Sequence, residues 1–549
     1  MSSFRDLSLG AALLAVSANA QLWDKTIQTT YGPVKGFEYF NSSTTEKYFN
    51  TSTSSVTAYL GIPFAADTGY QNRWKPPHPH EPWNETLLTT SFGPACPSAK
   101  NPTSSEDCLS LNIWTNANSS SDNLPVLVWN QGSGLSSDNP WWHGGGMAMK
   151  DVVFISFNRR DDAFGYLAHP DLNAEGLARD GFNPSGNYGV LDFLEVLKWV
   201  QGNIANFGGD PERVTIAGES FGSSQVYHAV NSELFSGLFS GAISQSGIRY
   251  PYDTLLAGLA TSYVTMDDAL FHGQNYTALH NASSIAEMRE LSMEELLVGS
   301  DVRLNGTWIW WVTALSSGYP WAFKPVLDGY VLPMKYIDQL VPGPANDVPL
   351  ITGNTRDESG VKLPTPGWTL QQYEEYSTLK YGNLSDRYFS LYPSNGNATE
   401  AGFAWNEAAR DLSYVGTWAY ATNWLKSASA PIYTYVWDHA PPGQSQGAFH
   451  QSEIMYVLNA LYANADRYSF TEEDYHIAEV ITSYWINFLR TGNPNEGDAY
   501  TAGNMSHWYP NDDMTKHVQR LGNGWGNVTV AEADKLEFFM DYFHQQTPY

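Results

Sequence analysis

The sequence has few basic residues. Lysine and arginine together number 29, against 57 aspartate and glutamate residues, and the formal net charge of the 549-residue chain is −28. Nucleic acids and anionic membrane surfaces carry charge of the same sign and would repel such a protein, so we expect neither as a partner. The imbalance bears on solubility and on partners rather than on the fold.

Long apolar runs are also missing, although hydrophobic residues make up 42% of the chain. No run after the first twenty residues approaches the roughly 20 residues that a membrane-spanning helix needs. The last residues, 543–549, carry neither a retention tetrapeptide nor a hydrophobic tail for a lipid anchor. We therefore expect no membrane span, and enough apolar material for a sizeable core.

Residues 1–20 have the pattern of a signal peptide. Arg5 provides a positive charge, residues 9–16 form a short apolar stretch, and Ala18-Asn19-Ala20 offers the small residues that signal peptidase requires. A buried N-terminal helix is the alternative interpretation. With the signal peptide removed, the mature chain is expected to be secreted.

Cysteine is scarce, since Cys96 and Cys108 are the only two. In an oxidising compartment, two cysteines so close in sequence predict one local disulfide. Two free thiols are the alternative.

N-x-Ser/Thr sequons agree with export, because they are acceptors for N-glycosylation in secreted proteins. Each one alone is a weak signal, but eleven of them avoid the motif segments described below and predict a glycosylated surface. They lie at Asn41, Asn50, Asn84, Asn118, Asn275, Asn281, Asn305, Asn383, Asn397, Asn504 and Asn527.

Short apolar runs alternate with glycine-rich turns and helical stretches. Residues 126–129, 152–155 and 214–217 are continuous apolar or β-branched runs, typical of strands buried on both faces of a mostly parallel sheet. Residues 191–200 have apolar positions at helical spacing. This alternation predicts an α/β fold with a large, mostly parallel sheet flanked by helices. No internal repeat divides the chain, so we expect residues 21–549 to form a single domain.

Gly218-Glu219-Ser220-Phe221-Gly222 is a G-x-S-x-G motif that follows one of these predicted strands and leads into a predicted helix. A serine on such a turn is forced into strained backbone angles that expose its hydroxyl above the sheet. The flanking glycines are needed because side chains there would collide with neighbouring backbone. In this context the motif predicts that Ser220 is a nucleophile.

Several further segments match one known family in order along the chain. They are YLGIPFA (59–65), EDCLSLN (106–112), GNYG (186–189), NFGGDP (206–211), SQSG (244–247), PVLDG (325–329) and YWINF (484–488). On these residues the chain resembles the type-B carboxylesterases, which include the cholinesterases and some fungal lipases. The resemblance covers nearly the whole mature chain and implies the α/β-hydrolase fold.

The resemblance also implies the partners of Ser220. Residues 353–359 match the segment that carries the acid of the family, which assigns Glu358, with Asp357 as its local rival. Residues 447–453 match the segment that carries the histidine, which assigns His450. In such a triad the histidine takes the serine proton during attack, and the acid orients the imidazole and stabilises its protonated form.

The family's oxyanion hole is a His-Gly-Gly-Gly-like run after an early strand. Here the strand at 126–129 runs into Asn130-Gln131-Gly132-Ser133-Gly134, so the resemblance assigns the backbone N–H groups of Ser133, Gly134 and Phe221 as the donors. The run His143-Gly144-Gly145-Gly146 matches in letters alone, because it lies where relatives have a short loop.

Cys96 and Cys108 match the family's first disulfide, and the eleven residues between them (97–107) make a much shorter loop than in cholinesterases and lid-bearing lipases. A small to medium-sized soluble ester is therefore the expected substrate, with no cofactor or metal. The predicted function is a secreted serine carboxylesterase. The alternatives are a non-catalytic adhesion or recognition relative of the same fold, and an acyltransferase that uses the same acyl-enzyme.

Overall fold

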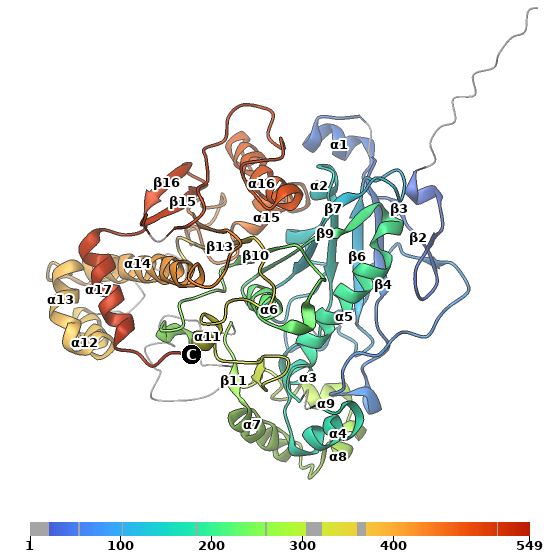
Figure 1. The fold of residues 1–549 in the computed structure, drawn as a ribbon, viewed down its shortest axis with the longest axis horizontal. Helices are drawn as coiled ribbons and strands as arrows, with labels where there is room; N and C mark the ends of the chain where they lie inside the picture. The colour runs from blue at the N-terminus through green and yellow to red at the C-terminus, as the bar shows by residue number, and fades with distance from the viewer. Residues whose placement is uncertain are drawn as a thin grey trace, which may run out of the picture.

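The computed structural model describes residues 21–52, 55–101, 103–182, 185–257, 261–303, 321–358, 369–512 and 514–549. Through their centre runs a twisted sheet in the order β16-β15-β14-β13-β10-β9-β7-β8-β6-β4-β3 (Figure 1). Its strands are β3 (Phe37–Glu38), β4 (Thr57–Pro63), β6 (Ser110–Thr115), β7 (Leu124–Asn130), β8 (Val153–Phe157), β9 (Gly209–Glu219), β10 (Gly241–Gln245), β13 (Leu350–Thr355), β14 (Ile432–Trp437), β15 (His517–Leu521) and β16 (Gly526–Thr529). Two small sheets pair β1 (Ile27–Gln28) and β5 (Leu87–Leu88) with β2 (Pro33–Lys35), and β11 (Val264–Thr265) with β12 (Val326–Leu327).

The middle of the sheet is parallel and its margins are antiparallel. Every pair from β8 through β7, β9, β10, β13 and β14 to β15 is parallel, whereas β16, β6, β4 and β3 join antiparallel. The three predicted strands are β7, β8 and β9, and the predicted helix lies within α5 (Tyr188–Asn203). The predicted fold class, a large, mostly parallel sheet flanked by helices, is confirmed.

Side chains of each central strand alternate between two apolar layers, as the pleat requires. In β7, Val126 and Val128 join a layer with α5 and α6 (Phe221–Val230), and Leu127 and Trp129 join the opposite layer with α16 (Glu472–Thr491). Helices therefore cover both faces of the sheet, and the carboxyl ends of its parallel strands meet along one edge, where ligand sites of such sheets lie.

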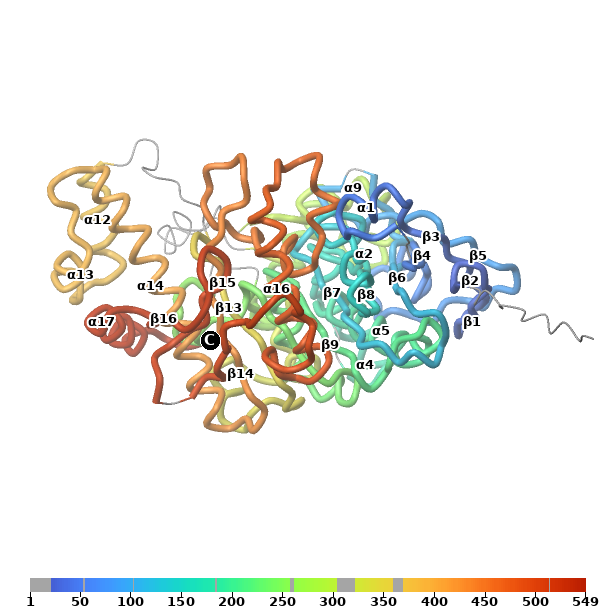
Figure 2. The backbone as a smooth tube through the Cα atoms, turned by 90° about the horizontal axis from the view of Figure 1, so that it is seen from above, coloured from blue at the N-terminus to red at the C-terminus, as the bar shows by residue number. Residues whose placement is uncertain are grey.

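The remaining helices surround this framework. They are α1 (Ser42–Phe49), α2 (Gly145–Ala148), α3 (Asp162–Tyr166), α4 (Pro170–Asp180), α7 (Met266–Leu279), α8 (Ile285–Glu290), α9 (Met293–Leu297), α11 (Tyr336–Gln339), α12 (Leu370–Tyr381), α13 (Ser385–Leu391), α14 (Ala398–Trp424), α15 (Ile454–Val457) and α17 (Ala533–His544). Helices α12, α13 and α17 gather at the end of the molecule farthest from β1 and β2 (Figure 2). Among the described residues, no helix combines the length and the apolar character needed to cross a bilayer.

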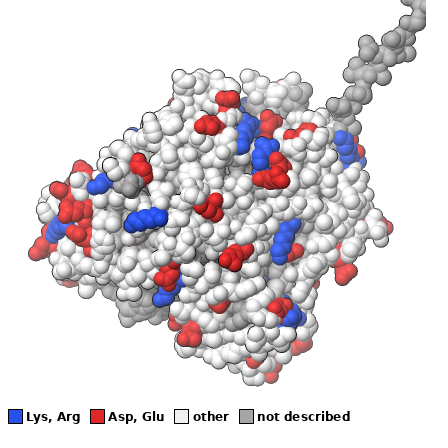
Figure 3. Space-filling view, in the orientation of Figure 1, with Lys and Arg blue, Asp and Glu red and all other residues white. Residues whose placement is uncertain are grey.

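Cys96 and Cys108 form the expected disulfide. Ten of the eleven sequon asparagines are exposed, while Asn305 and the predicted signal peptide, residues 1–20, lie outside the described residues. Acidic side chains are spread over the face shown in Figure 3, with a concentration at the edge where α12 and α13 lie.

Candidate active site

Ser220 occupies the turn between β9 and α6, with φ 57° and ψ −122°. The left-handed φ is strained for a residue with a Cβ, and such strain is typical of functional sites. The flanking glycines permit the turn, because a Cβ on Gly222 would lie 1.9 Å from the carbonyl oxygen of Asn130 and one on Gly218 would lie 2.5 Å from the Gly222 backbone. The Ser220 N–H donates to the carbonyl of Gln245 at 3.0 Å, which ties the turn to β10.

Glu358 and His450 meet across 92 residues of sequence. Glu358 follows β13, and His450 lies in the loop between β14 and α15. The Oε2 atom of Glu358 lies 2.5 Å from Nδ1 of His450, and its Oε1 accepts the N–H of Thr355 at 2.8 Å. A carboxylate on Nδ1 fixes the ring so that Nε2 faces away from it.

The Nε2 atom of His450 faces a second carboxylate. It lies 3.0 Å from Oε1 of the fully buried Glu219, the residue before Ser220. The other oxygen of Glu219 accepts a hydrogen bond from Nε2 of Gln451 at 2.8 Å. Among the hydrogen bonds of the described residues, none joins the Ser220 hydroxyl to His450. The structure thus brings Glu358, His450 and Glu219 into contact beside the serine.

The two carboxylates decide the charge of the imidazole. Burial acts to lower the pKa of His450, but Glu219 and Glu358 outweigh it and raise that pKa well above its ordinary value. Burial acts to raise the pKa of Glu358, and His450 outweighs it and lowers that pKa. Burial, with help from the same two carboxylates, raises the pKa of nearby Glu453 to about 8. Both shifts favour a protonated imidazole held between two carboxylates.

This charge arrangement predicts a shift in the pH profile of Glu219→Gln. The sequence predicts that His450 is a base, which must be neutral to accept a proton, and its raised pKa moves that neutral form to higher pH than in an ordinary histidine. Removing the Glu219 charge lowers the pKa, so the acid limb of kcat/KM should move to lower pH in a nitrophenyl ester assay. Glu212→Gln, on the exposed start of β9, is the matched control and should leave the limb in place. An unchanged or higher limb for Glu219→Gln would contradict the assignment.

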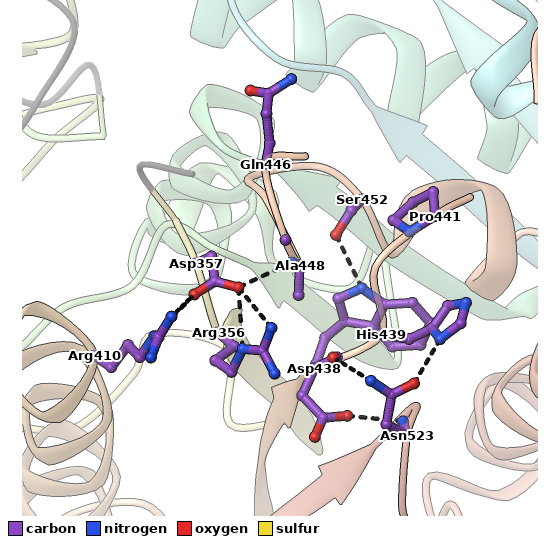
Figure 4. A network of polar contacts seen from close by, with 12 residues as sticks. Arg356, Asp357, Arg410, Asp438, His439, Pro441, Gln446, Ala448, Ser452 and Asn523 are labelled. Atoms are coloured by element: carbon purple, nitrogen blue, oxygen red, sulfur yellow. Dashed lines mark hydrogen bonds and ion pairs between the residues drawn. The ribbon is translucent and has the colours of Figure 1, made fainter. Parts of the chain in front are cut away.

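The loop that carries His450 is held by Asp357, the rival acid (Figure 4). The Asp357 carboxylate accepts the N–H of Ala448 at 3.0 Å and a hydrogen bond from Arg410 Nε at 2.8 Å, and its own N–H donates to the carbonyl of Ala448 at 2.9 Å. Arg356 donates to the same carboxylate at 3.0 Å. Asp357 therefore positions the histidine loop, and its carboxylate has no contact with the His450 ring among the described interactions.

The three predicted oxyanion donors lie on two elements. Phe221 is the first residue of α6, and its buried ring packs edge-on against Tyr166 and beneath the Arg159 guanidinium. The loop after β7 carries the other two donors, and the carbonyl of Ser133 accepts a hydrogen bond from Lys100 at 2.9 Å. The Gly134 N–H donates to the Asp161 carboxylate at 2.7 Å.

The glycine run after His143 has a packing role. An added Cβ on Gly144 would lie 2.3 Å from the Phe154 ring, and one on Gly146 would lie 1.9 Å from the carbonyl oxygen of Asn459. These glycines let α2 approach β8 and the segment after α15 closely. The sequence His143-Gly144-Gly145-Gly146 matches the family's oxyanion motif, but in the structure these glycines serve to pack α2 against its neighbours.

Glu219, Asp161 and Arg159 are site residues that sequence reasoning missed. Glu219 is the first x of the G-x-S-x-G motif, and its side chain is fully buried. Arg159 and Asp161 belong to a run of four charged residues (159–162) that begins two residues past the end of the buried strand β8. Charges placed at the end of a buried strand are the signal that could have pointed to them. Among the described residues, no group of three or more metal-binding side chains is arranged to hold an ion.

A family model described as "Carboxylesterase family" matches residues 23–527. The chain is 30% identical to fumonisin B1 esterase of Sphingopyxis macrogoltabida, covering 94% of this chain and 90% of that protein. It is 29% identical to para-nitrobenzyl esterase of Bacillus subtilis, covering 85% and 90%.

Comparison with solved structures also finds esterases that superpose on nearly the whole chain. A PNB esterase superposes with a TM-score of 0.71 at 26% identity, over 94% of this chain and 99% of that one. A carboxylesterase of Geobacillus stearothermophilus superposes with a TM-score of 0.73 at 25% identity, with the same coverage.

Proposed function

Because this chain belongs to the carboxylesterase family, and is thereby a carboxylic ester hydrolase with the α/β-hydrolase fold, we propose that Ser220, His450 and Glu358 form its catalytic triad. The observation that carries the proposal is the 2.5 Å contact between Glu358 and His450, which the fold assembles beside the strained Ser220 turn.

The chemistry follows from these positions. With His450 in its neutral form, Ser220 Oγ attacks the ester carbonyl carbon while its proton passes to Nε2 of His450, which must turn from Glu219 toward the serine. The tetrahedral intermediate collapses to an acyl-enzyme, and the same proton leaves with the alcohol. Water then attacks the acyl carbon and gives one proton to Nε2. The second tetrahedral intermediate collapses as Nε2 returns that proton to Ser220 Oγ, which releases the acid and regenerates the serine hydroxyl. Glu358 stabilises the protonated imidazole in both halves.

The substrate is a small-molecule ester, and we propose one of small to medium size. The loop closed by Cys96 and Cys108 has only eleven residues (97–107), too few for a long flap over the site. The relatives named above act on fumonisin B1 and para-nitrobenzyl esters, so the same scaffold serves different small esters.

A nitrophenyl ester series, from acetate to laurate, tests the mechanism and the substrate size together. We expect the highest kcat/KM at short to medium acyl chains, and complete loss of hydrolysis after a fluorophosphonate has labelled the Ser220 peptide. Labelling at another residue would overturn the triad. A preference for laurate that rises at an oil–water interface would overturn the substrate class.

We also propose that the protein is secreted and N-glycosylated. The signal pattern of residues 1–20 and the exposure of the ten described sequon asparagines support this. Protein recovered from the medium of a eukaryotic host should begin at Gln21 and lose mass on treatment with a peptide N-glycosidase. Retention inside the cell with residues 1–20 intact would contradict the proposal.

A further inference from the structure

One of the three predicted oxyanion donors is already occupied in this structure. The Gly134 N–H donates to Oδ2 of Asp161 at 2.7 Å. Asp161 is only 4% exposed, and a hydrogen bond from an amide to a buried carboxylate is roughly twice as strong as one between neutral groups. An N–H group directed at a carboxylate in this way is not directed at a substrate oxygen.

Asp161 is itself fixed by its surroundings. Its Oδ1 lies 3.4 Å from Nε of Arg159, which is 3% exposed and whose nitrogens have no hydrogen-bond partner among the described residues. The Arg159 guanidinium lies 5.1 Å from the centre of the Phe221 ring. The buried ion pair of Arg159 and Asp161 therefore links two parts of the site. Asp161 contacts Gly134 in the loop after β7, and Arg159 contacts Phe221, the first residue of α6.

The loop after β7 that carries Ser133 and Gly134, here called the oxyanion loop, is also held by hydrogen bonds to its carbonyl groups. The carbonyls of Ser133 and Gly134 accept hydrogen bonds from Lys100 Nζ at 2.9 Å and Asn101 Nδ2 at 3.2 Å. With its carbonyls tied on one side and the Gly134 N–H tied on the other, the loop is restrained from rotating that N–H toward Ser220.

From these contacts we propose that Asp161 is a positioning residue that holds the Gly134 N–H out of the oxyanion hole, so that Ser133 and Phe221 provide its two working donors. The inference rests on the proposed function of Ser220. One oxyanion donor is typically worth about 10²–10³ in kcat. The Asp161 carboxylate thus keeps this enzyme slower than its triad would allow.

The test removes the competing acceptor without leaving a buried charge. Asp161→Leu alone would strand the Arg159 guanidinium, which is strongly destabilising. The test variant is therefore Arg159→Met with Asp161→Leu, and its matched control is Arg159→Met with Asp161→Asn. Both pairs are neutral, leucine and asparagine have the same number and branching of side-chain heavy atoms, and only the asparagine keeps an acceptor for the Gly134 N–H.

We expect kcat on nitrophenyl acetate to be higher in the leucine pair than in the asparagine pair, by up to about 10²-fold, with a similar KM. A trifluoromethyl ketone, which adds to the serine and forms an oxyanion, should bind tighter by a similar factor. A folded leucine pair whose kcat and ketone affinity equal or fall below those of the asparagine pair would overturn the proposal.

A structure of the wild-type protein with the same ketone decides the matter even if the leucine pair does not fold. The hemiketal oxygen should accept hydrogen bonds from the Ser133 and Phe221 N–H groups while Gly134 remains on Asp161. A Gly134 N–H directed at the hemiketal oxygen would refute the inference and leave the triad standing. The absence of any adduct on Ser220 would instead overturn the proposed function and this inference together.

Discussion

Replacing Ser220 by alanine is expected to lower kcat on nitrophenyl acetate by on the order of 10⁵–10⁶-fold, the loss typical of removing a triad nucleophile. Without the hydroxyl no acyl-enzyme can form, and what remains comes from binding and from the oxyanion donors. Alanine keeps the Cβ of residue 220, so it removes the hydroxyl without relieving the strained φ of 57°.

Ser224→Ala is the matched control for that experiment. Ser224 lies one turn further along α6, is buried, and donates its hydroxyl to the carbonyl of Phe221 at 2.7 Å. Its loss should change kcat by no more than a few-fold, and only the Ser220 variant should lose fluorophosphonate labelling. Hydrolysis by folded Ser220→Ala at a hundredth or more of the wild-type rate would show that another residue performs the attack.

Much of the framework of this site could be predicted from the sequence, because it depends on local patterns. Residues 126–129, 152–155 and 214–217 are continuous apolar or β-branched runs, which favour strands buried on both faces of a mostly parallel sheet, and they lie in such a sheet as β7, β8 and β9. The Ser220 turn was predictable for a similar reason, since Gly218 and Gly222 are required by contacts that the strand-to-helix turn itself creates.

The electrostatic setting of the site could not be predicted in the same way. The contact between Glu219 and His450 joins residues 231 positions apart, and nothing near Glu219 in sequence indicates that its carboxylate is buried against a histidine. The hydrogen bond from Gly134 to Asp161 depends on how the loop after β7 lies against the loop after β8. Such contacts follow from tertiary packing, and in this chain they bear on the charge of the proposed base and on the number of free donors in the proposed oxyanion hole.

The identity of the acid gives the second large effect, because Glu358 and Asp357 are adjacent and both are acidic. Glu358→Gln keeps the shape of the side chain and removes the charge that stabilises the protonated imidazole on Nδ1. We expect kcat to fall by about 10⁴-fold, as when a triad aspartate is replaced by its amide. Asp357→Asn removes a charge from the histidine loop but leaves an oxygen that can accept the Ala448 N–H. It should lower kcat by less than about tenfold and lower the melting temperature, because it weakens the contacts with Arg356 and Arg410.

The pH profile also distinguishes Glu358 from Asp357, because of these two only Glu358 contacts the His450 ring among the described interactions. Glu219 remains as a carboxylate partner of that ring when Glu358 is replaced. In Glu358→Gln the pKa of His450 should fall, so the residual activity should have its acid limb at lower pH than the wild type. In Asp357→Asn the limb should stay in place, since Asp357 acts on the loop and not on the ring. If Asp357→Asn instead produced the larger loss of kcat together with a shifted limb, Asp357 would be the acid of the triad. The contact of Glu358 with Nδ1 would then be accessory. The loop around Ala448 would have to move before the reaction, so that the Asp357 carboxylate could reach the His450 ring.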